Sequence, residues 1–96
     1  MRYIFPIIIT FTRQVSEPQY LVHLPDFDAM TQGLSLADAI EMGEDLACIL
    51  ALRYEEEGQP VPEASLLEDL ARKNPESIVA LVVADTDEYR KLSKTS

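Results

Sequence analysis

The chain has 96 residues, of which 47% are apolar and 26% are charged, and its formal net charge is −9. This length suits a single domain, residues 1–96, built around one hydrophobic core. The excess of 17 acidic over 8 basic residues disfavours general binding to RNA or DNA, because such binding relies on Lys and Arg to displace counterions from phosphates.

Other whole-chain features point to the cytoplasm. No apolar run reaches the roughly 18 residues of a membrane-spanning helix, so we expect no membrane association. The N-terminus lacks the basic flank and cleavage site of a signal peptide. Cys48 is the single cysteine and has no partner for an internal disulfide. The acidic charge either attracts a basic protein partner or serves only to keep the chain soluble.

The N-terminal third predicts an antiparallel three-stranded meander. Residues 3–11 are rich in β-branched and aromatic side chains, and residues 20–24 alternate between two faces. A polar turn at residues 14–19 joins them as a hairpin. Pro6 has no N–H to donate, so we expect it at an edge or a bulge. Residues 30–32 form a short third strand.

Residues 35–58 predict the main helix. Ser35 can cap its first turn, Asp38 completes a capping box, and Gly58 is a suitable stop. Its apolar side chains recur at steps of three and four residues and should cover one face of the sheet: Leu36, Ala39, Ile40, Gly43, Leu46, Ala47, Leu50 and Tyr54. The opposite face carries acidic side chains: Asp38, Glu41, Asp45, Glu55 and Glu56.

The C-terminal third predicts a short helix and a returning strand. A second capping box, Ser65 to Glu68, opens a helix that runs to Lys73. Residues 77–84 are almost continuously apolar, which indicates a strand buried on both faces or at the sheet centre. The order is β-β-β-α-(α)-β. The fold class is therefore α+β, a two-layer sandwich with a meander and a fourth strand packed under one long helix.

Six short motifs occur in a set order: Phe5-Pro6, Pro25-Asp26-Phe27, Thr31-Gln32-Gly33, Ser35-Leu36-Ala37-Asp38-Ala39, Gly58-Gln59-Pro60-Val61-Pro62 and Tyr89-Arg90. In this order and spacing, the chain resembles the HicB-like antitoxin family from residue 3 to about residue 92. The resemblance implies a partial RNase H-like fold, related in layout to double-stranded-RNA-binding domains. It also implies that the chain neutralises a small basic toxin of the HicA type, an mRNA-cleaving ribonuclease. Many relatives add a C-terminal DNA-binding module, for which we expect no room here, so operator binding is not carried over.

Two clusters are candidate partner-binding residues. One is the turn of Asp26, Phe27 and Asp28, and the other is the helix end at Glu55 and Glu56, where acidic residues oppose the helix dipole. The competing interpretations are ordinary: turn aspartates commonly cap their own backbone, and acidic helix ends are commonly solvated. A metal held by Asp26 and Asp28 is the less favoured interpretation, and we expect no metal or cofactor.

Two further residues receive structural interpretations. His23 is the only histidine, so a triad or a histidine metal cluster would lack partners. Cys48 lies beside the apolar stripe of the main helix, with nothing basic next to it in sequence, and should be a small, partly buried helix residue.

Three functional hypotheses remain open from the sequence. The leading one is a non-catalytic antitoxin that binds a small basic ribonuclease. The alternative is a stand-alone RNA-binding domain, and the third is a nuclease that would need at least three clustered acids. We also expect a homodimer or a higher oligomer, because the apolar strands at residues 3–11 and 77–84 leave edges or faces that two helices do not cover.

Overall fold

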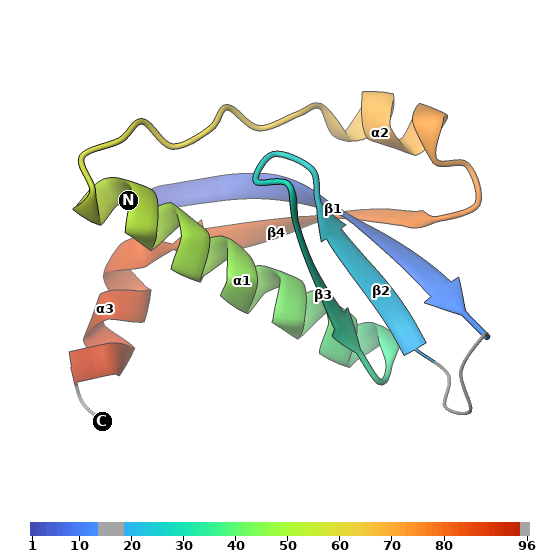
Figure 1. Ribbon diagram of the computed structural model, residues 1–96, viewed down its shortest axis with the longest axis horizontal. Coiled ribbons are helices and arrows are strands. Elements are labelled where there is room, and N and C mark those ends of the chain that lie inside the picture. The colour runs from blue at the N-terminus through green and yellow to red at the C-terminus, as the bar shows by residue number, and fades with distance from the viewer. Residues whose placement is uncertain (14–18, 95–96) are drawn as a thin grey trace.

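The computed structural model describes residues 1–13 and 19–94 (Figure 1). The elements are β1 (Arg2–Thr12), β2 (Gln19–Leu24), β3 (Ala29–Gly33), α1 (Leu36–Glu56), α2 (Leu67–Lys73), β4 (Ile78–Asp85) and α3 (Thr86–Lys94). Every pairing in the sheet is antiparallel, and the strand order is β3-β2-β1-β4. The predicted α+β class, meander and returning strand are confirmed. The turn predicted at residues 14–19 falls almost wholly outside the described residues.

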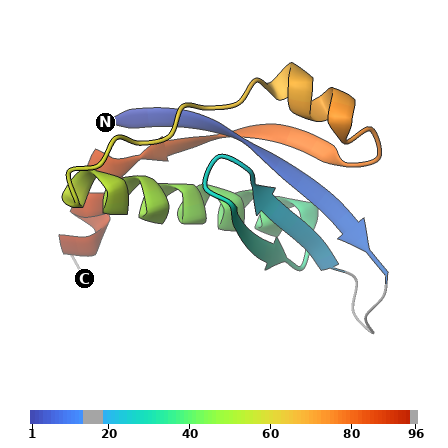
Figure 2. The same ribbon diagram turned by 45° about the horizontal axis from the view of Figure 1, so that its top comes forward.

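The sheet carries α1 on one side and α2 on the other, and Val61 of the linker between the two helices packs against the core. Figure 2 shows α1 below β1 and β4 and α2 above them. Every β1 residue from Phe5 to Ile9 is buried, so this strand has apolar neighbours on both faces. Pro6 pairs with β4, but the β2 pairing of β1 begins only at Ile8. The predicted edge position of Pro6 is therefore confirmed on its β2 side.

The buried side of α1 consists of small residues: Ala39, Gly43, Ala47, Cys48 and Ala51. A Cβ atom on Gly43 would lie 3.0 Å from Ile7 Cδ1 and 3.2 Å from Val22 Cγ1, so the helix axis comes very close to the sheet. The buried stripe of α1 is therefore narrower than the apolar stripe that the sequence predicted. Leu36 and Ile40 were assigned to that stripe, and both are exposed.

β4 corrects one prediction. Its continuous apolar run indicated burial on both faces or a central place, yet β4 forms one edge of the sheet and, among the described residues, pairs only with β1. Ile78 and Leu81 are 47% and 54% exposed. A continuous apolar run can therefore also form an edge strand, with some of its apolar side chains exposed in the single chain.

The helix starts give one confirmation and one correction. Ser35 Oγ accepts a hydrogen bond from the Asp38 N–H, so the predicted cap by Ser35 is confirmed. Asp38 accepts in turn from the Leu34 N–H, one residue before the position that a capping box would use. The second capping box was wrong. α2 begins after Leu66, and Ser65 donates instead to a carboxylate on the β2–β3 turn. Among the described residues, no helix is long and apolar enough to cross a membrane.

Candidate protein-binding surface

The β2–β3 turn is held by contacts that are distant in sequence. Asp26 accepts hydrogen bonds from the Ser65 N–H, at 3.0 Å to Oδ1, and from the Ser65 hydroxyl. The expectation that Asp26 caps its own turn was therefore wrong. Phe27 packs edge-on against Phe5, with ring centroids 4.7 Å apart. Asp28 is exposed and has a φ of 50°, a left-handed conformation that Asp tolerates in turns.

Glu55 lies inside a polar cluster rather than on a solvated helix face. Its carboxylate accepts hydrogen bonds from the Tyr3 hydroxyl at 2.8 Å, the Thr86 hydroxyl at 2.9 Å and the Arg90 guanidinium at 3.1 Å. Burial raises the pKa of Glu55, but the hydrogen bonds from Tyr3 and Thr86 and the charges of the N-terminal ammonium and Arg90 outweigh it and hold that pKa below its usual value. This carboxylate ties α1 to β1 and α3, so the sequence assignment to the solvated face was wrong.

The structure brings the two predicted clusters near each other. Phe27 of the turn contacts Tyr54 at the end of α1, with ring centroids 5.8 Å apart. Tyr54 precedes the inward-facing Glu55, whereas Glu56 is exposed. Of the five predicted partner-binding residues, Asp28 and Glu56 present carboxylates to solvent, and the other three make intramolecular contacts. That any of them contacts a partner stays a prediction.

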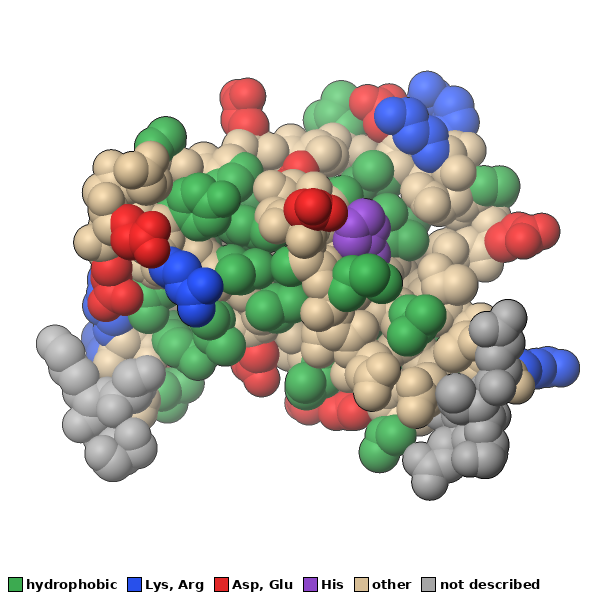
Figure 3. Space-filling model, viewed as in Figure 1, with side chains coloured by type: hydrophobic (Ala, Val, Ile, Leu, Met, Phe, Trp, Pro, Cys, Tyr) green, Lys and Arg blue, Asp and Glu red, His purple; other side chains and the backbone are tan. Residues whose placement is uncertain are grey.

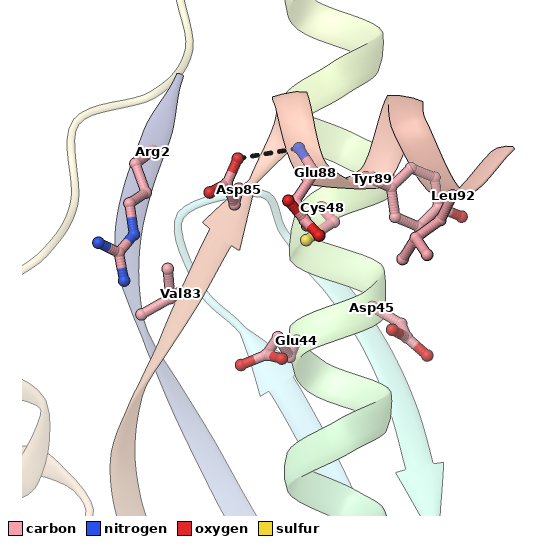
Figure 4. Close-up of a pocket in the computed structure, with 9 residues that line it drawn as sticks. All are labelled: Arg2, Glu44, Asp45, Cys48, Val83, Asp85, Glu88, Tyr89 and Leu92. Atoms are coloured by element: carbon pink, nitrogen blue, oxygen red, sulfur yellow. Dashed lines mark hydrogen bonds between the residues drawn. The ribbon is translucent and has the colours of Figure 1, made fainter. Parts of the chain in front are cut away.

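A second acidic site was not singled out from the sequence. It is a pocket between α1, β4 and α3, which we call the acidic pocket (Figure 4). Its lining comes from four elements: Arg2, Glu44, Asp45, Cys48, Val83, Asp85, Glu88, Tyr89 and Leu92. The only sequence signal was the acidic face of α1. What could not be foreseen was that α3, after β4, would bring Glu88 beside it.

The acidic pocket has an apolar base and a charged rim. Cys48 is 8% exposed, and Tyr89 packs against the hydrophobic core. Burial raises the pKa of the Cys48 thiol, which keeps it protonated and poorly reactive at neutral pH. Figure 4 shows Glu44 and Asp45 extending from α1, and the Asp85 carboxylate accepting a hydrogen bond from the Glu88 N–H.

His23 and the outer sheet surface form a third, apolar region. His23 lies with Ile8, Leu21 and Met30 around a second pocket. In the view of Figure 3, hydrophobic side chains gather over the middle of the molecule and most acidic side chains lie around its margin. Such a mixture of apolar surface and acidic surroundings is suited to a protein partner.

The described part of the chain contains no cluster of side chains suited to bind a metal ion. Across residues 1–13 and 19–94, no group of three or more His, Cys, Asp or Glu side chains could hold a metal ion. The nuclease hypothesis requires such a group. Asp26, which that hypothesis would use, is instead engaged with Ser65.

Comparisons with known proteins identify the fold. No family model matches the sequence, and no curated protein matches it. A chain of a toxin–antitoxin complex from Streptococcus pneumoniae is similar in structure, with a TM-score of 0.76 and 24% identity over 93% of this chain and 73% of that one. The antitoxin HicB of Burkholderia pseudomallei gives a TM-score of 0.71 and 25% identity over 83% of this chain and 61% of that one.

A chain of the HicA3–HicB3 toxin–antitoxin complex is also similar, with a TM-score of 0.60 and 24% identity, over 86% of this chain and 99% of that one. The chain therefore has the fold of HicB antitoxins, which confirms the resemblance that the six motifs indicated. It spans less than two thirds of the length of the Burkholderia antitoxin.

Proposed function

We propose that this chain is an antitoxin that binds a small basic toxin of the HicA type and blocks its cleavage of mRNA. The main support is the fold, which matches a HicB antitoxin and chains of two toxin–antitoxin complexes. The structural likeness to the pneumococcal chain extends over 93% of this chain. Inhibition by an antitoxin requires a stable surface that covers the toxin and needs no catalytic group of its own.

The charge of the chain supports a basic partner. A net charge of −9 attracts a cationic protein and accelerates their encounter at low salt. Exposed apolar side chains, including Met30 and Leu34, supply surface whose burial can hold the complex once it has formed. Acidic margins around apolar surface fit a partner that itself binds RNA through basic side chains.

Stand-alone RNA binding has less support. RNA recognition needs free cationic and aromatic side chains on one face. Arg90 is paired with Glu55 and Asp87, and Arg72 is paired with Asp69. These pairings reduce the cationic surface of a chain that is already strongly acidic.

We also infer that two copies of the chain associate through the outer edge of β4. Unpaired strand edges without charged residues readily pair with another strand. β4 has no charged side chain from Ile78 to Ala84, and Ile78 and Leu81 of this strand expose apolar surface. Antiparallel pairing of two β4 strands over Ile78–Leu81 would extend the sheet and cover these side chains.

Co-expression with the product of the neighbouring small basic gene tests the proposed function. The expected result is a complex that co-purifies through size exclusion and dissociates more readily as salt rises. Failure of this chain to bind any HicA-type toxin would contradict the proposal. Binding of the chain alone to structured RNA at low salt would favour the alternative instead.

A further inference from the structure

We propose that the acidic pocket receives an Arg or Lys side chain of the basic partner. This inference rests on the proposed function and names the place where the partner is anchored. The pocket lies where α1, β4 and α3 meet, and β1 adds Arg2 at its margin (Figure 4). It is separate from the β2–β3 turn, none of whose residues lines it.

The lining of the pocket matches the two chemical parts of a long cationic side chain. Cys48, Val83, Tyr89 and Leu92 offer apolar surface to the methylene stem. Carboxylates around them can accept charge-assisted hydrogen bonds from the guanidinium or ammonium group. An anionic ligand would meet repulsion in the same place, and a purely apolar one would leave the carboxylates partly desolvated.

The charges in the pocket are not balanced. Four carboxylates line it, against the single guanidinium of Arg2. The ion pairs within residues 1–13 and 19–94 include none of these carboxylates: Glu44, Asp45, Asp85 and Glu88. Like charges in a concave site with low-dielectric walls concentrate a negative potential, and a cation that enters relieves their mutual repulsion.

The pocket is also formed before any partner arrives. Arg90 of α3 bonds Glu55 of α1 at 3.1 Å, which fixes the two helices that make its walls. The Asp85 carboxylate caps α3 by accepting the Glu88 N–H at 3.0 Å. Because these contacts already order the walls, an entering side chain loses its own conformational freedom but does not have to order the pocket.

Two double variants of equal charge test the inference. Glu44→Gln with Glu88→Gln removes two carboxylates from the pocket, and the control, Glu68→Gln with Glu76→Gln, removes two exposed carboxylates around α2. All four side chains are exposed, so both proteins should fold, which circular dichroism can verify. The pocket variant should weaken toxin binding about tenfold and the control less than about twofold, since exposed charges with no direct partner contribute little.

A second measurement separates this inference from the proposed function. In the ¹⁵N-labelled wild-type chain, titration with N-acetyl-arginine amide should shift the amides of Cys48, Val83 and Glu88, and the pocket variant should lose these shifts. Equal weakening of toxin binding by both double variants would overturn the inference but leave the antitoxin role intact. If the chain binds no toxin, the proposed function fails and the arginine titration decides the pocket. Absence of pocket shifts would then overturn the inference.

Discussion

Asp26 and Ser65 are joined by hydrogen bonds although 39 residues separate them. The bonds connect the β2–β3 turn to the linker that precedes α2. They also explain why Ser65 does not cap α2: its N–H and hydroxyl are both directed to the Asp26 carboxylate. The linker is thereby fixed beside Phe27 and the end of α1.

Asp26→Ala should destabilise the chain by about 0.5–1.5 kcal/mol, because the exposed Ser65 N–H and hydroxyl lose their charged acceptor and turn to water instead. Chemical denaturation of the variant measures this change. In a double-mutant cycle, Asp26→Ala and Ser65→Ala should be clearly non-additive. Glu63→Ala, an exposed linker change, should stay within about 0.5 kcal/mol of the wild type. Additive effects at Asp26 and Ser65 would show that the two do not interact in solution.

Gly33→Ala should be among the most destabilising single changes in the chain. A Cβ atom at Gly33 would lie 2.4 Å from the Ala39 N and 2.6 Å from the Ala39 Cα, so the start of α1 would have to move. We expect a loss of about 3 kcal/mol, at the upper end of the range for overpacking. Thermal unfolding measures it.

Gly58→Ala is the comparison for that change. Gly58 has a φ of 69°, and nothing lies within 4 Å of its added Cβ. The loss of stability should therefore come only from holding alanine in a left-handed backbone conformation. That conformation costs a residue with a Cβ about 1–2 kcal/mol of stability. A larger loss at Gly58 than at Gly33 would contradict the close approach of β3 to α1.

Glu55 makes part of the stability dependent on pH. Its folded-state pKa lies below the usual value of a glutamate, so its contribution is complete above that usual value and is lost as pH falls through the lower folded pKa. Glu55→Gln should therefore be less stable than the wild type at neutral pH, with a difference that narrows as the pH falls from about 5 into the acid range. Urea denaturation across that range measures both proteins. A difference that does not change with pH would contradict the ionised, hydrogen-bonded state of Glu55.

The local patterns of this sequence predicted most of the fold. Alternation in residues 20–24 and the helix cap by Ser35 depend on neighbours in sequence, and both predictions were confirmed. Ser65 and Glu55 were assigned wrongly because their partners, Asp26 and Tyr3, are distant in sequence. Long-range polar partners leave no local periodic signal.

The candidate site was only partly predictable for the same reason. The acidic face of α1 was visible as a pattern, but the acidic pocket also needs Asp85 and Glu88, which come from the other end of the chain. The edge position of β4 was missed because an apolar run does not reveal how many strands flank it.

Leu81→Lys should convert a dimer into a monomer. Leu81 is 54% exposed on the edge strand, and a charge there would have to be buried in the dimer that we infer. Light scattering coupled to size exclusion, at micromolar concentration, should give twice the chain mass for the wild type and the chain mass for the variant. Leu66→Lys, at a leucine before α2 that is 66% exposed, should remain dimeric. A monomeric wild type would remove the inference about β4.

The measurement that tests the antitoxin role most directly is inhibition of a purified HicA-type toxin by this chain. The toxin from the neighbouring gene would cleave a labelled mRNA while the chain is added in increasing amounts. The account predicts that cleavage falls to background at a fixed stoichiometric ratio and that the chain alone leaves the RNA intact. Undiminished cleavage at a severalfold excess of the folded chain would contradict it.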